Sequence, residues 1–77
     1  MLKAEIYTTE SCQYNVRIKS ILDRRSIHYE EFFIGNHLTR DDFYCKFENA
    51  KTVPQIILDG KYIGGFEALC YELKETP

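Results

Sequence analysis

Cys12 stands where a polar turn meets the start of a predicted helix, a position that suits thiol chemistry. The unpaired backbone N–H groups at a helix N-terminus carry partial positive charge, which favours a thiolate over a thiol. A thiolate is the species that attacks a disulfide sulfur, so we expect Cys12 to take part in thiol–disulfide exchange. The alternative is a small buried apolar residue. The polar residues Thr9, Glu10 and Ser11 directly before Cys12 disfavour that alternative.

The first half of the chain predicts two strands and two helices that would position this cysteine. Residues 3–8 alternate in polarity and are rich in strand-forming side chains, and residues 28–34 form a similar run. Between them, the apolar positions of residues 12–25 recur at helical spacing. Thr39 precedes two aspartates and is a suitable N-cap for a short helix whose apolar face carries Phe43 and Phe47.

The second half predicts a hairpin and a final helix. Residues 53–58 and 61–63 flank Asp59-Gly60, a strong hairpin signal. One face of the final helix is formed by Phe66, Leu69, Cys70 and Leu73. The first strand–helix–strand unit should be a right-handed parallel crossover, to which the hairpin adds antiparallel strands. This order predicts a minimal thioredoxin-like α/β domain that occupies residues 1–77 as a single domain.

Composition excludes several other classes of protein. A net charge of −2 gives no electrostatic reason to expect nucleic-acid binding, and no apolar run approaches the ~20 residues that span a bilayer. The N-terminus lacks a signal-peptide pattern and three cysteines cannot complete a disulfide framework, so we expect reduced thiols in the cytoplasm. We also expect a monomer. His28 and His37 are not spaced with the cysteines as metal ligands, so we expect no metal site.

Two segments carry a resemblance to a known family. Residues 6–15, Ile-Tyr-Thr-Thr-Glu-Ser-Cys-Gln-Tyr-Asn, resemble the active-site segment of glutaredoxins, whose usual form is Cys-Pro-Tyr-Cys. Residues 52–56, Thr-Val-Pro-Gln-Ile, followed by Asp59-Gly60 and by Ile-Gly-Gly-Phe at residues 63–66, are similar to the second half of that family. The resemblance covers essentially the whole chain. It implies a thioredoxin-like fold in which a four-stranded mixed sheet is flanked by three helices.

The resemblance also implies a glutathione-dependent thiol–disulfide oxidoreductase in which Cys12 is the catalytic residue. Pro54 would follow a cis peptide bond and leave the Val53 backbone free to pair with the cysteinyl part of glutathione; the alternative is a trans proline at a strand edge. Gly64-Gly65 would open a helix N-terminus to the γ-glutamyl carboxylate, although two glycines alone are more often a simple turn. The implied glutathione contacts are Tyr14, Arg40, Lys51, Thr52, Val53, Pro54, Gly65, Phe66 and Glu67.

Position 15 departs from the pattern of the dithiol members of the family. It is Asn where those members have a resolving cysteine, so Cys12 cannot form a disulfide within this motif. Cys70 is most simply a core residue, and Cys45 lies beside the apolar face of a predicted helix. The chemistry that remains is a one-cysteine cycle, with glutathione and glutathionylated or disulfide-containing proteins as partners.

The glutathione site departs from the family at two further positions and has an acidic residue beside one of them. Thr9 replaces a Lys that many members direct at the glycine carboxylate, Glu10 adds an acid that opposes a thiolate, and Ala68 replaces an Asp that contacts the γ-glutamyl group. Arg40 and Lys51 match basic positions that some members direct at the same carboxylate, the alternative being ordinary solvated side chains. We therefore expect a glutathione site that is present but weakened.

Two other functions stay open alongside this one. Some one-cysteine glutaredoxins hold an iron–sulfur cluster between two protomers through the active cysteine and glutathione. The motif Cys-Gln-Tyr-Asn at residues 12–15 differs from the Cys-Gly-Phe-Ser of that branch, which disfavours this function. The other is a thioredoxin-like interaction module with weakened redox activity, which Thr9 and Ala68 favour.

Overall fold

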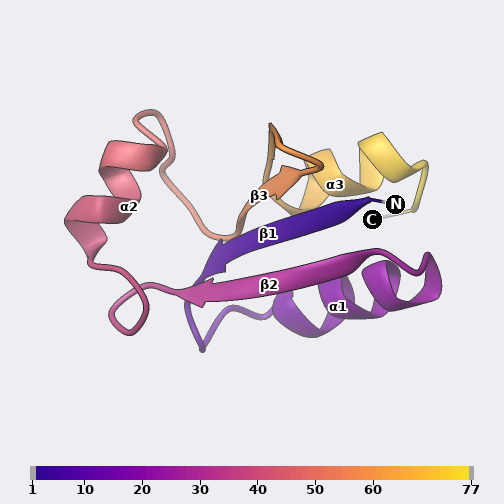
Figure 1. The fold of residues 1–77 in the computed structure, drawn as a ribbon, viewed down its shortest axis with the longest axis horizontal. Coiled ribbons are helices and arrows are strands. Elements are labelled where there is room, and N and C mark those ends of the chain that lie inside the picture. Colours follow the sequence, from indigo (N-terminus) through magenta and orange to yellow (C-terminus); the bar gives the residue numbers. More distant parts are fainter. Residues whose placement is uncertain (1, 77) are drawn as a thin grey trace.

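Four strands form one mixed sheet in the order β2–β1–β3–β4 in the computed structural model, which describes residues 2–76 (Figure 1). Strand β1 pairs in parallel with β2 and antiparallel with β3, which in turn pairs antiparallel with β4. The fold is therefore the predicted thioredoxin-like glutaredoxin fold with three helices. The elements in chain order are β1 Lys3–Thr8, α1 Asn15–Arg24, β2 His28–Phe33, α2 Arg40–Lys46, β3 Gln55–Leu58, β4 Lys61–Gly64 and α3 Phe66–Leu73.

Side chains of β1 alternate between two hydrophobic clusters. Ala4 and Ile6 belong to the larger cluster, which includes the buried faces of α1 and α3. Tyr7 points to the opposite side of the sheet, where it packs against the α2 residue Phe43 and its neighbour Phe47. Helix α2 lies beyond the ends of β1 and β2 (Figure 1), so the second cluster sits at that end of the sheet. Within residues 2–76, no helix is long and apolar enough to cross a bilayer.

Helix α1 begins later than the sequence predicts. The predicted start is Cys12, whereas the first helical residue is Asn15. Residues 9–15 instead form successive turns, in which the Cys12 N–H donates to the Thr9 carbonyl at 3.2 Å and the Asn15 N–H donates to the Cys12 carbonyl at 3.3 Å. Cys12 thus precedes the helix by three residues rather than opening it.

Strand boundaries near two other loops also differ from the prediction. Strand β3 begins at Gln55 instead of residue 53, because Pro54 has no N–H to donate to a neighbouring strand. Strand β2 ends at Phe33, and Ile34 forms only an isolated bridge with Leu38. The Val53–Pro54 peptide bond is cis, as the resemblance implies.

Two local predictions are confirmed by their hydrogen bonds and dihedral angles. Thr39 caps α2: its Oγ1 accepts a hydrogen bond from the Asp42 N–H at 3.0 Å, and the Asp42 carboxylate accepts one from the Thr39 N–H at 3.4 Å. Asp59 and Gly60 have positive φ angles of 52° and 84°, the conformation that a tight hairpin turn requires.

An ion-pair cluster ties the segment after α3 to the end of α1. The Glu75 carboxylate accepts hydrogen bonds from Arg25 Nε at 2.6 Å and from Arg24 Nη2 at 3.2 Å. Arg25 is 50 residues away in the sequence, so this contact closes a long loop. The hydrogen bond from Arg25, with a further one from Arg24, holds the pKa of Glu75 below its ordinary value of 4.5.

We expect Glu75→Gln to lower the melting temperature slightly at neutral pH, because the arginine side chains are 61% and 40% exposed and the ion pairs are screened by solvent. A carboxyl group whose pKa is lower in the folded protein stabilises the fold at pH values above its pKa in the unfolded chain. That contribution is lost as the pH falls through the pKa in the folded protein. The melting temperatures of wild type and variant should therefore converge as the pH falls below the ordinary carboxyl range. The exposed Glu72, changed to Gln, is the control, and a constant difference across that range would contradict the assignment.

Candidate functional site

The Cys12 thiol lies against the loop that precedes β3. Its Sγ is 4.0 Å from the carbonyl oxygen of Val53, within reach of a weak S–H hydrogen bond. The side chain is half-buried, whereas Cys45 is exposed and Cys70 is 1% exposed. Of the three, Cys12 alone combines access to solvent with a place beside a backbone loop.

The two other thiols are poorly placed for the same chemistry. Cys70 lies in the larger hydrophobic cluster, as its position on the apolar face of α3 predicts. Burial raises the pKa of the Cys70 thiol, which disfavours the reactive thiolate. Cys45 lies on α2 and lines a separate hollow with Phe47 and Tyr62.

Asn15 fastens the turn that carries Cys12. Its side chain is 8% exposed, its Nδ2 donates to the Thr9 carbonyl at 2.9 Å, and its Oδ1 accepts from the Thr8 hydroxyl at 2.9 Å. Thr8 ends β1 and Asn15 begins α1, so a single amide side chain joins the two elements on either side of the turn.

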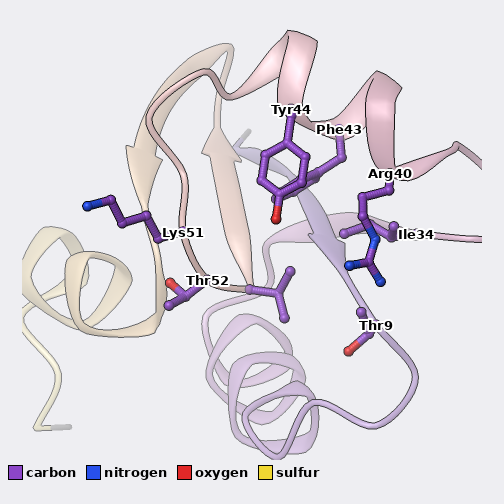
Figure 2. Close-up of a pocket in the computed structure, with 8 residues that line it drawn as sticks. Thr9, Ile34, Arg40, Phe43, Tyr44, Lys51 and Thr52 are labelled. Carbon is purple, nitrogen blue, oxygen red and sulfur yellow. The ribbon is translucent and has the colours of Figure 1, made fainter.

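A first hollow of about 210 Å³ opens on one side of the Val53 loop (Figure 2). Arg40 and Tyr44 reach it from α2, where they are four residues apart and share one helix face. In Figure 2 the Arg40 guanidinium extends toward Thr9, whereas the Lys51 amine extends away from the other lining residues. The lining consists of Thr9, Ile34, Arg40, Phe43, Tyr44, Lys51, Thr52 and Val53. Its only charged side chains are cationic, so the hollow favours an anion.

A second hollow of about 350 Å³ opens on the other side of the same loop. Phe66 forms its aromatic wall: the ring stacks on Tyr14 with centroids 4.8 Å apart, and the Arg17 guanidinium carbon lies 4.6 Å from the Phe66 centroid. The one charged residue of the lining is Glu67 in the first turn of α3. The lining consists of Tyr14, Thr52, Val53, Pro54, Gly65, Phe66, Glu67 and Ala68.

Gly65 permits the close approach of α3 to the Pro54 loop. A Cβ at this position would lie 3.3 Å from the Pro54 carbonyl oxygen, tighter than an ordinary van der Waals contact. Gly65 is also the N-cap of α3 and has no side chain to satisfy the first helical N–H groups. The start of α3 therefore presents backbone donors beside the second hollow.

Every glutathione contact implied by the resemblance lines one of the two hollows. Thr52 and Val53 line both and form the wall between them, next to Cys12. Thr9 and Ala68, where the sequence departs from the family, line the first and the second hollow respectively. Tyr44 also lines the first hollow and is not among the predicted contacts, although its spacing of four residues from Arg40 on a predicted helix could have indicated it.

Comparisons with known proteins agree with this geometry. The glutaredoxin family model matches residues 4–63. Glutaredoxin 3 of Escherichia coli strain K12 is 35% identical over 69 residues, which cover 90% of this chain and 83% of the relative. Glutaredoxin 1 of Rickettsia conorii is 38% identical over 66 residues; these cover 83% of this chain but only 65% of the length of that relative.

Solved structures show the same likeness. The crystal structure of glutaredoxin 1 from Francisella tularensis, complexed with cacodylate, superposes with a TM-score of 0.79 at 31% identity and covers 96% of this chain and 94% of that one. A wheat glutaredoxin has a TM-score of 0.74 at 17% identity, covering 92% of this chain and 70% of its own, and supports the fold alone. Together, the family match over most of the chain and the relatives above 30% identity show that this chain belongs to the glutaredoxin family.

Proposed function

We propose that this protein is a glutathione-dependent thiol–disulfide oxidoreductase that works through Cys12 alone. The observation that carries the proposal is the place of the Cys12 thiol beside the carbonyl of Val53, a residue that lines both the cationic and the anionic hollow. A peptide thiol that lies along Val53 would bring its sulfur to Cys12 and its two ends into the two hollows. Glutathione has the length and the end groups for this arrangement.

The charges of the hollows fit the two ends of glutathione. The glycine carboxylate belongs in the first hollow, where Arg40 can donate charge-assisted hydrogen bonds. The γ-glutamyl group belongs in the second hollow, where its carboxylate faces the N-terminus of α3 and its ammonium can pair with Glu67. Ala68 supplies no polar group there, so the second hollow should bind its end of the ligand more weakly than the first.

The reaction then needs two exchange steps. The Cys12 thiolate attacks the glutathione sulfur of a protein–glutathione disulfide; the new S–S bond joins Cys12 to glutathione, and the protein thiolate leaves and takes up a proton. A second glutathione, as its thiolate, attacks the glutathione sulfur of this adduct, releases glutathione disulfide and regenerates the Cys12 thiolate. The protein thiol is released, and the glutathionyl group taken from the substrate leaves in a disulfide with one free glutathione, the reductant of the cycle. Asn15 cannot intercept the adduct, because it has no thiol.

Mass spectrometry and steady-state kinetics test this cycle together. The protein mixed with a glutathionylated peptide, without free glutathione, should acquire one glutathionyl group at Cys12 and release the reduced peptide. With both substrates varied, double-reciprocal plots should be parallel, as a double-displacement cycle requires. A folded wild-type protein that neither forms the adduct nor turns over would refute the proposal.

A further inference from the structure

Asn15 stands where dithiol glutaredoxins have the resolving cysteine, and its side chain is hydrogen-bonded within the turn that carries Cys12. The amide is 8% exposed and both of its ends are satisfied, by the Thr8 hydroxyl and by the Thr9 carbonyl, each at 2.9 Å. The Thr9 carbonyl also accepts the N–H of Cys12 at 3.2 Å. One carbonyl oxygen therefore holds the backbone of Cys12 and the side chain of Asn15 at once.

The two hydrogen bonds at position 15 require an amide side chain. Position 15 must accept a hydrogen bond at one atom and donate one at the other, from a side chain long enough to reach both Thr8 and Thr9. An ionised aspartate cannot donate, and an alanine can do neither. Because the site is buried, an unmet donor or acceptor there costs more than the same group in water.

We infer that Asn15 is a positioning residue, which fixes the turn of residues 9–12 so that the Cys12 sulfur stays against the Val53 carbonyl. The inference rests on the proposed role of Cys12 as the reacting thiol, but it concerns the turn and not glutathione. Without the Asn15 amide, the turn keeps its backbone hydrogen bonds and the 3.4 Å hydrogen bond from the Thr8 hydroxyl to the Thr9 carbonyl. It loses the two hydrogen bonds that tie the start of α1 to Thr8 and Thr9. The thiol then samples directions from which it cannot attack a disulfide held along Val53.

Two reactions of Cys12, one that requires a fixed direction of attack and one that does not, distinguish this positioning role from a loss of fold. In Asn15→Ala, exchange with a glutathionylated peptide should slow by roughly five- to thirtyfold, the factor that one or two hydrogen bonds of ordinary net strength correspond to. Alkylation of Cys12 by iodoacetamide, which needs no fixed direction of approach, should not slow with it. The matched control is Asn36→Ala in an exposed loop, which should change neither rate. Equal rates in wild type and variant, or an equal fall in both reactions, would overturn the inference.

Hydrogen exchange gives a readout that does not depend on activity. The Cys12 amide should lose protection in Asn15→Ala, because the carbonyl that accepts it is no longer held. In Asn15→Asp the protection should be low at neutral pH and should recover as the pH falls, since a protonated carboxyl can donate to Thr9 and accept from Thr8 as the amide does. If the wild type proves inactive, the proposed function fails while this measurement still decides the role of Asn15. Unchanged Cys12 protection in both variants would overturn it.

Discussion

Cys12→Ser should reduce the exchange of a glutathionylated peptide to the uncatalysed rate. A serine hydroxyl remains protonated near neutral pH and is not a nucleophile toward disulfide sulfur, so neither step of the proposed cycle can start. The substitution is nearly isosteric at a half-buried position, and the variant should keep its fold. The measurement is the initial rate of peptide release at saturating glutathione, with the circular dichroism spectrum as a check of folding.

The exposed Cys45 provides the matched control for this experiment. It lies on α2 and lines neither of the two hollows beside Val53, so Cys45→Ser should retain the wild-type rate. Retention of activity in Cys12→Ser together with its loss in Cys45→Ser would mean that Cys45 is the reacting thiol, and would contradict the proposal.

Arg40→Gln should raise the concentration of glutathionylated peptide needed for half-maximal rate by about tenfold, with little change in the maximal rate. A charge-assisted hydrogen bond to a carboxylate is worth ~1.5 kcal/mol or more, and Arg40 is exposed, which keeps the expected effect near the lower limit. The loss should appear in binding because the glycine carboxylate is remote from the sulfur that reacts. Initial rates over a range of peptide concentrations at fixed glutathione give both parameters.

Two controls sharpen the Arg40 prediction. Lys51→Gln removes a cation from the same hollow, but its amine extends away from the lining, so the effect should be smaller (Figure 2). A peptide whose glutathionyl group carries an esterified glycine carboxylate should bind the wild type more weakly and should show no further loss in Arg40→Gln, because the partner of the arginine is already gone. Independent, additive losses would mean that Arg40 does not contact that carboxylate.

The fold could be predicted from the sequence largely because its local signals agree with one another. The alternation in residues 3–8, the cap at Thr39 and the Asp59-Gly60 turn each act over a few residues, and the structure contains all three. The start of α1 could not be predicted in this way. Helical spacing extends back to Tyr14, but the backbone before it bonds in turns, and periodicity alone does not distinguish a turn from a first helical turn.

In the candidate site too, some residues could be predicted from sequence motifs and others depend on the tertiary structure. The residues of the two hollows could be named from motifs, because the family resemblance ties positions far apart in the sequence to one ligand. Tyr44 carries no such motif; its spacing from Arg40 places it on the same helix face, and the structure shows that this face lines the first hollow. For Asn15 the sequence shows only that a thiol is missing; that its amide bonds two atoms at the end of β1 depends on tertiary geometry.

Because the three cysteines differ in burial, their rates of chemical labelling report how often the folded protein opens. Cys70 is 1% exposed within the larger hydrophobic cluster, so a labelling reagent reaches it only when α3 separates from the sheet. Its rate of modification in native buffer measures how often the core opens, without denaturant. Cys45 in the same sample reports the rate of a fully accessible thiol. One timed labelling experiment thus gives the stability of any variant alongside the reactivity of Cys12, on the same molecules.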